Sequence, residues 1–210
     1  MIFLIQKLFI IIFSIPIMIT KINNEVLKFT FKEFGSLCYL IKNKILIDAG
    51  SIENRSEFIQ DFQKNNLKIE NVDTILLTHL HWDHIGNIAL FKNAKVYCSS
   101  KELEDFQKDR AAFFRMQDLS LLPEIDKIQF HDIKEFSRKN KDFKIIEVPG
   151  HTEGSLAFLY KGVLFSGDTL FDETGDCIGR TDLPSSRPEF MESSLKKLLS
   201  LKFKILCPGH

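Results

Sequence analysis

One short segment carries more metal-binding side chains than an ordinary core or surface requires. It reads Thr78-His79-Leu80-His81-Trp82-Asp83-His84-Ile85-Gly86 and places three imidazoles and a carboxylate within six positions. Nitrogen and oxygen donors that converge from one short segment suit a zinc-like ion. The apolar run over residues 72–77 just before it predicts a buried strand. The chain therefore has to turn sharply at the end of that strand to aim alternate side chains at one point.

The spacing within this segment favours two ions rather than one. His79 and His81 can share one ion, whereas Asp83 and His84 point elsewhere and suit a second. Gly86 is expected to allow a tight turn into the next element, over residues 85–91.

Three further donors occur in the same setting, just after an apolar run and a glycine. They are His151 after residues 143–148, Asp168 after residues 162–165, and His210 after the run that starts at Ile205. Five of the six histidines therefore lie at strand ends. His131 has neither a glycine turn nor a donor beside it, so we expect it to be structural or solvated.

Asp48 also ends an expected strand, over residues 44–47, shortly before Gly50. Metal-bound histidines usually donate their second ring N–H to a carboxylate or a carbonyl. We therefore expect Asp48 to support a ligand from the second shell, with a turn-capping role as the alternative.

Together these residues resemble the metallo-β-lactamase superfamily over residues 26–210. The resemblance is carried by the H-x-H-x-D-H run at 79–84 and by the motifs Ile47-Asp48-Ala49-Gly50, Pro149-Gly150-His151-Thr152-Glu153-Gly154-Ser155, Phe165-Ser166-Gly167-Asp168-Thr169-Leu170-Phe171 and Pro208-Gly209-His210. Within the superfamily, Gly179-Arg180-Thr181-Asp182-Leu183-Pro184 is similar to the glyoxalase II (hydroxyacylglutathione hydrolase) branch, and persulfide dioxygenases carry a similar stretch.

The resemblance implies a binuclear metallohydrolase. One divalent ion would be held by His79, His81 and His151, and the other by Asp83, His84 and His210. Asp168, with two carboxylate oxygens, would bridge them, which makes Asp83 and Asp168 the expected catalytic carboxylates. A hydroxide shared by two ions about 3.5–4 Å apart would attack the carbonyl of the substrate. Zinc is the expected metal, and iron and manganese suit the same donors.

The same resemblance implies a thioester or related ester as substrate, S-lactoylglutathione being an example. Arg180 would meet a substrate carboxylate or pair with Asp182. Glyoxalase II enzymes continue past the last metal histidine into a helical domain that supplies much of the glutathione site, whereas this sequence ends at His210. We therefore expect the thioester assignment to lack that support. Either the terminal carboxylate beside His210 is able to coordinate, or the chain is a fragment that binds the second ion poorly.

Other functions of the superfamily stay open. A persulfide dioxygenase would use one iron at His79, His151 and Asp168 and would consume oxygen, and a lactonase would use the same two-ion centre. A nuclease needs a basic surface, but the chain has 28 basic and 28 acidic side chains. A class B β-lactamase often has a cysteine where Asp168 stands. A degenerate binding module is disfavoured because no donor position has been lost.

The implied fold is α+β, a four-layer αβ/βα sandwich of two mixed β-sheets with outer helices. Strands are also expected over residues 26–34, 37–41 and 95–98, and helices over 53–66, 100–117 and 188–200. Residues 111–116 would either overhang the cleft as a lid or pack on the sheet. At 210 residues the chain is long enough for one domain, residues 21–210, with a sizeable core.

The four cysteines form no C-x-x-C pair, which indicates a reducing compartment with buried thiols and hence a cytoplasmic domain. Cys177 is the exception, in a loop. Residues 1–20 are apolar apart from a few positions such as Lys7. They would be a membrane anchor or uncleaved signal, a cleaved signal, or the product of a mis-set start with Met18 as the true first residue. The expected partners are a small-molecule substrate and, through residues 1–20, a membrane, but no nucleic acid.

Overall fold

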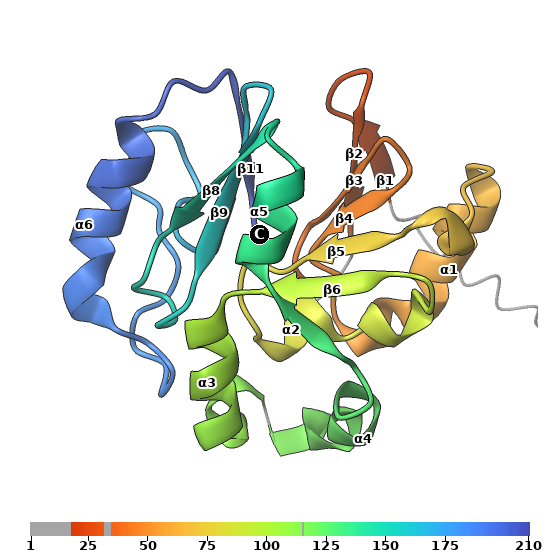
Figure 1. Ribbon diagram of the computed structural model, residues 1–210, viewed down its shortest axis with the longest axis horizontal. Helices are drawn as coiled ribbons and strands as arrows, with labels where there is room; N and C mark the ends of the chain where they lie inside the picture. The colour runs from red at the N-terminus through yellow and green to blue at the C-terminus, as the bar shows by residue number, and fades with distance from the viewer. Residues whose placement is uncertain (1–17, 32–34, 115) are drawn as a thin grey trace, which may run out of the picture.

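The computed structural model describes residues 18–31, 35–114 and 116–210. Two β-sheets form its centre (Figure 1). The seven-stranded sheet has the order β1-β2-β3-β4-β5-β6-β7, with bounds Met18–Lys21, Val26–Thr30, Cys38–Ile41, Ile45–Ile47, Thr74–Leu76, Lys95–Cys98 and Phe130–Asp132. The four-stranded sheet has the order β11-β10-β9-β8; in chain order β8 to β11 its bounds are Phe143–Glu147, Leu156–Tyr160, Val163–Gly167 and Ile205–Pro208.

The helices are short and connect or cover these strands. The α-helices α1 to α6 have the bounds Arg55–Lys64, Trp82–Ile85, Ser100–Lys108, Leu122–Ile125, Ile133–Lys139 and Pro188–Leu199. Short 3₁₀ helices η1 to η5 have the bounds Ile52–Asn54, Ile69–Asn71, Ile88–Leu90, Arg110–Phe113 and Met116–Leu121.

Three apolar clusters hold the layers together. Between the sheets, Tyr39 of the larger sheet meets Phe165 of the smaller one with ring centroids 5.1 Å apart. On the outer face of the larger sheet, Phe29 packs against Phe58 and Phe62 of α1. On the outer face of the smaller sheet, cluster residues from β8 to β10 pack against α6, which stands outside that sheet in Figure 1. The expected sandwich of two sheets with outer helices is confirmed.

Both sheets are mixed, and their strand directions bring the ligand-bearing loops together. β4, β5 and β6 are parallel, so the loops that follow them leave the same edge of the larger sheet. β10 is parallel to β11, and β8 runs the same way because β9 is antiparallel to both β8 and β10. The loops after β8, β10 and β11 therefore leave one edge of the smaller sheet. Backbone hydrogen bonds from Leu156 N–H to the Thr78 carbonyl (2.8 Å) and from Leu37 N–H to the Gly209 carbonyl (2.6 Å) join the two edges.

Two expected elements differ at their ends. The helix expected over residues 100–117 ends at Lys108, because the next residue, Asp109, leaves helical geometry and its side chain accepts a hydrogen bond from Ala112 N–H (3.3 Å) to start η4. Met18–Lys21 forms β1 and pairs with β2, so residues 18–20 lie in the larger sheet although we had grouped them with the apolar segment. Residues 1–17, the rest of that segment, lie outside the described residues.

The cysteines and the helices relate to two further expectations, buried thiols and a membrane anchor. Cys38, Cys98 and Cys207 are free thiols in the buried core, as expected from their apolar settings, and Cys177 is exposed. In the described part of the chain, each helix is too short or too polar to traverse a lipid bilayer.

Candidate metal centre

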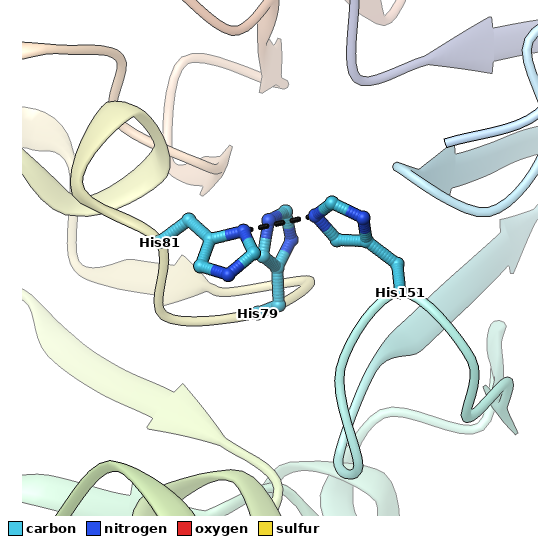
Figure 2. A group of neighbouring side chains, drawn as sticks. All are labelled: His79, His81 and His151. Atoms are coloured by element: carbon cyan, nitrogen blue, oxygen red, sulfur yellow. Dashed lines mark hydrogen bonds between the residues drawn. The ribbon is translucent and has the colours of Figure 1, made fainter. Parts of the chain in front are cut away.

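The loop after β5 alternates between the core and the site. Leu80 is fully buried in the apolar cluster outside the larger sheet. Its neighbours His79 and His81 turn the other way and face His151, which comes from the loop after β8 (Figure 2). α2 begins directly after His81 and returns the chain toward the site. The expected strand-to-turn geometry is therefore present.

Gly86 is needed for close contact rather than for an unusual turn. Its backbone angles, φ −58° and ψ −27°, are ordinary helical values that any residue adopts. A Cβ on Gly86, however, would collide with the backbone of Ser51 and Ile52. Gly86 N–H donates to the carbonyl of Gly50 over 2.8 Å. The expected turn is present, over Gly86 and Asn87 before η3, but its geometry does not require a glycine. Gly86 instead lets the ligand loop lie against the loop after β4.

The seven expected donors meet in three overlapping groups, within each of which the donor atoms lie no more than 4.8 Å apart. The groups are His79, His81 and His151; His79, His84 and Asp168; and Asp83, His84 and His210. The first and the third are the two ligand sets that the resemblance implied. His81 Nδ1 and His151 Nε2 are only 2.9 Å apart, so both nitrogens face one point.

Asp168 stands between the two outer groups. Its Oδ2 lies 3.5 Å from His151 Nε2 and 3.3 Å from His210 Nε2. Its Oδ1 lies 3.4 Å from His84 Nε2. One carboxylate thus reaches imidazoles of both groups, as a bridging ligand must.

Several of these donor atoms are buried without a hydrogen-bond partner, as ligands of a cation would be. Among the described residues, His79 Nε2, His84 Nε2 and Asp168 Oδ1 are shielded from solvent and accept or donate no hydrogen bond. Leaving a buried polar atom unsatisfied costs about 1–3 kcal/mol, and such atoms are rare in folded proteins. Three of the seven side-chain atoms so buried among the described residues are thus gathered in the donor groups, which fits a divalent cation.

The charge states of the cluster also suit a cation. Burial, reinforced by neighbouring imidazoles, lowers the pKa of His79 and of His81 well below the ordinary value, so both rings are held neutral, the form that binds metal. Burial opposes ionisation of Asp168, but the charge of His84 and the nearby His210 ring, with Nε2 3.3 Å from Oδ2, hold its pKa well below the ordinary value. The rings of His79 and His81 are thus neutral beside an ionised carboxylate. Burial opposes protonation of His84 and His210 as well, but the Asp168 carboxylate raises the pKa of both, and a bound cation would displace those protons.

Asp48 lies beside the donor groups without joining them. Its Oδ1 accepts a hydrogen bond from Thr78 N–H (2.8 Å), and its Oδ2 accepts from the Thr78 hydroxyl (2.8 Å) and lies 2.9 Å from His84 Nδ1. None of the three donor groups contains it. Asp48 has φ +55°, in the left-handed region, which aims its carboxylate back at the next strand's loop. Asp48 thus contacts the donor His84 directly, and its support of a metal ligand stays a prediction.

The remaining ring nitrogens of the first group are also held. His151 Nδ1 lies 2.7 Å from the Arg180 carbonyl oxygen, which can only accept, so this ring nitrogen carries the proton. His81 Nε2 lies 2.8 Å from the Ser185 hydroxyl, and His79 Nδ1 lies 3.0 Å from the Thr78 hydroxyl. Each ring is therefore fixed by its outer nitrogen and presents the inner one to the site.

Sequence reasoning missed Glu102, which ties two ligand loops together. This fully buried carboxylate on α3 accepts hydrogen bonds from Leu80 N–H (2.9 Å), between the first two histidines, and from the Thr152 hydroxyl (2.7 Å) and Gly154 N–H (2.9 Å), just after His151. Burial raises its pKa to about 7, although these hydrogen bonds act in the opposite direction. A Cβ on Gly154 would collide with Glu102, which explains why a residue without a side chain stands at position 154.

A cavity of about 550 Å³ opens beside the donors and is lined by His81, Asp83, His151, Asp168 and His210. Arg180 lines it too, but its guanidinium makes two hydrogen bonds to Asp182, of 2.9 and 2.8 Å, as the structural alternative for Arg180 required. Residues Ala111 to Phe114 form part of the wall, while Phe113 and Phe114 are buried in the core. This segment therefore both packs on the core and covers the cleft.

His131 lies away from the centre, as expected. It sits on β7, with its ring 5.5 Å from that of Tyr97, and lines a separate cavity of about 690 Å³. None of the seven donors lines that cavity, so we do not place the reaction there although it is the larger of the two.

Comparison with known proteins gives a consistent result. A family model described as the metallo-beta-lactamase superfamily matches residues 32–210. The hydroxyacylglutathione hydrolase GloC of Haemophilus influenzae is 32% identical over 209 residues, covering 90% of each chain. The probable metallo-hydrolase MJ0296 of Methanocaldococcus jannaschii is 35% identical over 124 residues, 59% of this chain, and the match spans only 50% of its own length. Among solved structures, TTHA1623 in a di-iron-bound form superposes with a TM-score of 0.63 and 28% identity, over 86% of this chain and 90% of that one.

Proposed function

The chain belongs to the metallo-β-lactamase superfamily, and on this premise we propose that it is a binuclear metal-dependent hydrolase that cleaves a thioester or a related ester. The main support for this proposal is the position of Asp168. Its two oxygens reach imidazoles of both outer donor groups, at 3.3 to 3.5 Å. A carboxylate so placed suits two ions held side by side.

The seven donors would hold the ions in two sets that share one residue. His79, His81 and His151 would hold one, Asp83, His84 and His210 the other, and Asp168 both. Two divalent cations at these donors would supply an activated water and polarise the carbonyl of the substrate. In the net reaction, water adds at the carbonyl carbon, the bond from that carbon to the leaving sulfur or oxygen breaks, and the leaving group takes up a proton.

The side chains around the donors position the reaction. Asp83 and Asp168 are the donor carboxylates that line the cavity, so we assign both to catalysis. Asp48 holds His84 and the Arg180 carbonyl holds His151, which fixes the direction of each inner nitrogen. Ring orientation fixed in this way is worth about 10–100-fold in metal affinity or activity.

The donor set does not select one metal by its chemistry. Imidazole and carboxylate ligands suit zinc, iron and manganese. Zinc remains our first proposal, and the di-iron form of TTHA1623 supports iron as the second. The similarity to GloC supports a hydroxyacyl thioester as one substrate to test.

A single assay separates this function from the alternatives. Protein of known metal content is incubated in air with a thioester, a lactone and glutathione persulfide, while thiol, acid and oxygen are followed. We expect thiol release from the thioester without oxygen uptake. Oxygen uptake with the persulfide alone would replace the proposal with a mononuclear-iron dioxygenase, and turnover of the lactone alone would replace it with a lactonase.

A further inference from the structure

We infer that the cavity beside the candidate metal centre selects substrates by an apolar acyl chain rather than by an anionic carrier such as glutathione. The inference rests on the proposed hydrolytic function and concerns the substrate class of the same site. It comes from the surfaces that surround the donors.

Apolar side chains flank the donors on both sides. Phe113 of η4 lies with its ring 5.5 Å from the ring of His81. Phe171, after β10, lies with its ring 6.0 Å from that of His210. Both phenylalanines line the cavity, together with Ala112 of η4 and Leu183 from another loop. Apolar side chains therefore line the cavity both beside His81 and beside His210.

One part of this surface is exposed to water in the free protein. Ile178 keeps 38% of its surface accessible, and among the described residues only a few large apolar side chains are exposed to this degree. It lines the same cavity, so an acyl chain in the cavity would cover it. Removing apolar surface from water is favourable in proportion to the area covered.

The charges around the cavity do not favour an anionic carrier. Apart from the donor groups, Arg180 is the cation among the described residues that line the cavity. Its guanidinium already makes two hydrogen bonds to Asp182, and both side chains are about two-thirds exposed (68% and 69%). Glutathione carries two carboxylates, which would have to compete with Asp182 for this one partner. An ion pair between Arg180 and a glutathione carboxylate would be just as exposed, so it would add little to the free energy of substrate binding.

The test varies the acyl chain on one leaving group and adds a glutathione thioester for comparison. Acetyl, butanoyl and hexanoyl thioesters of N-acetylcysteamine are compared with S-lactoylglutathione on the same metal-loaded enzyme. A fully buried methylene is worth about a fourfold change in rate constant. We expect kcat/KM to rise about two- to fourfold per added methylene, and the hexanoyl thioester to exceed S-lactoylglutathione. A flat or falling series, or a clear preference for the glutathione thioester, would overturn the inference.

Two variants assign the effect to the cavity. Ile178→Ser removes apolar surface from the cavity, and Phe190→Ser removes a comparably exposed ring on α6 outside it. The ratio of hexanoyl to acetyl kcat/KM should fall about threefold or more in Ile178→Ser and stay unchanged in Phe190→Ser. Equal ratios in both variants and the unmodified protein would place the selectivity elsewhere and refute the assignment.

The outcomes also separate this inference from the proposed function. If no thioester is cleaved by protein that holds its metal, the hydrolytic function itself fails. If all are cleaved but chain length has no effect, the function stands and the apolar-chain inference fails.

Discussion

Asp48 and His84 are joined by a contact of 2.9 Å between Oδ2 and Nδ1, which turns the other ring nitrogen of His84 toward Asp168. A carboxylate oxygen that is ionised can only accept a hydrogen bond, so His84 Nδ1 carries a proton and Nε2 is the nitrogen that would bind an ion. A residue 36 positions earlier in the chain thereby sets the tautomer of a ligand.

Asp48→Asn tests that relationship. Asparagine tolerates the left-handed backbone at this position, but its amide N–H₂ can take the place of Oδ2 and would favour the wrong tautomer of His84. We expect the fold to persist and the metal affinity to fall about 10–100-fold. Competition with a chromogenic chelator measures this, with Asp142→Asn at an exposed turn as the control. Equal affinities for both variants would show that Asp48 only caps its turn.

Asp168→Ala removes the proposed bridge. Because Asp168 reaches both outer groups, we expect thioester turnover to be lost and the bound metal to fall well below that of the unmodified protein. Elemental analysis and thioester hydrolysis are measured on the same samples, and Asp142→Ala serves as the matched variant. Retention of full activity in Asp168→Ala would contradict the bridging role.

Glu102→Ala tests the link between the two ligand loops. The substitution leaves Leu80 N–H and Gly154 N–H buried without an acceptor. At about 1–3 kcal/mol for each lost partner, unfolding should become about 2–6 kcal/mol easier. Denaturant unfolding of the metal-free protein measures this change, and Glu104→Ala on the exposed side of α3 is the control. A Glu102→Ala variant as stable as the control would mean that the loops do not depend on this carboxylate.

The same carboxylate predicts a pH dependence of stability. Burial raises the pKa of Glu102 from the ordinary 4.5 to about 7 in the folded protein. Between these values the folded state binds more protons than the unfolded state, so the contribution of this group is full below pH 4.5 and is lost as the pH rises through 7. With chelator present, the free energy of unfolding of the unmodified protein relative to Glu102→Gln should fall by about 3 kcal/mol from pH 4.5 to 8. If the difference in unfolding free energy between the two proteins stays constant or grows with pH, the pKa of Glu102 is not raised by folding.

Much of the candidate site was predictable because each donor is marked locally. His151, Asp168 and His210 each follow an apolar run and a glycine, and strand direction then carries them to one edge. The pairing of Arg180 with Asp182 was visible as one of two alternatives because the residues are only two positions apart.

The parts that sequence reasoning missed depend on distant contacts. The hydrogen bonds of Glu102 span 22 to 52 positions, and nothing in the polar stretch around it distinguishes it from its exposed neighbours. No element was predicted for β7, α5 or β9. The strand β1 was not separable from the apolar run before it, since its pairing with β2 is what defines it. The reason for Gly86 was misjudged because the backbone that crowds it lies more than 30 positions earlier.

The most direct test of the central claim is anomalous diffraction from crystals loaded with zinc. The account predicts two zinc peaks about 3.5–4 Å apart, one about 2.0–2.1 Å from nitrogens of His79, His81 and His151 and the other bound by Asp83, His84 and His210, with Asp168 touching both. A single peak, or zinc bound away from these seven side chains, would contradict it.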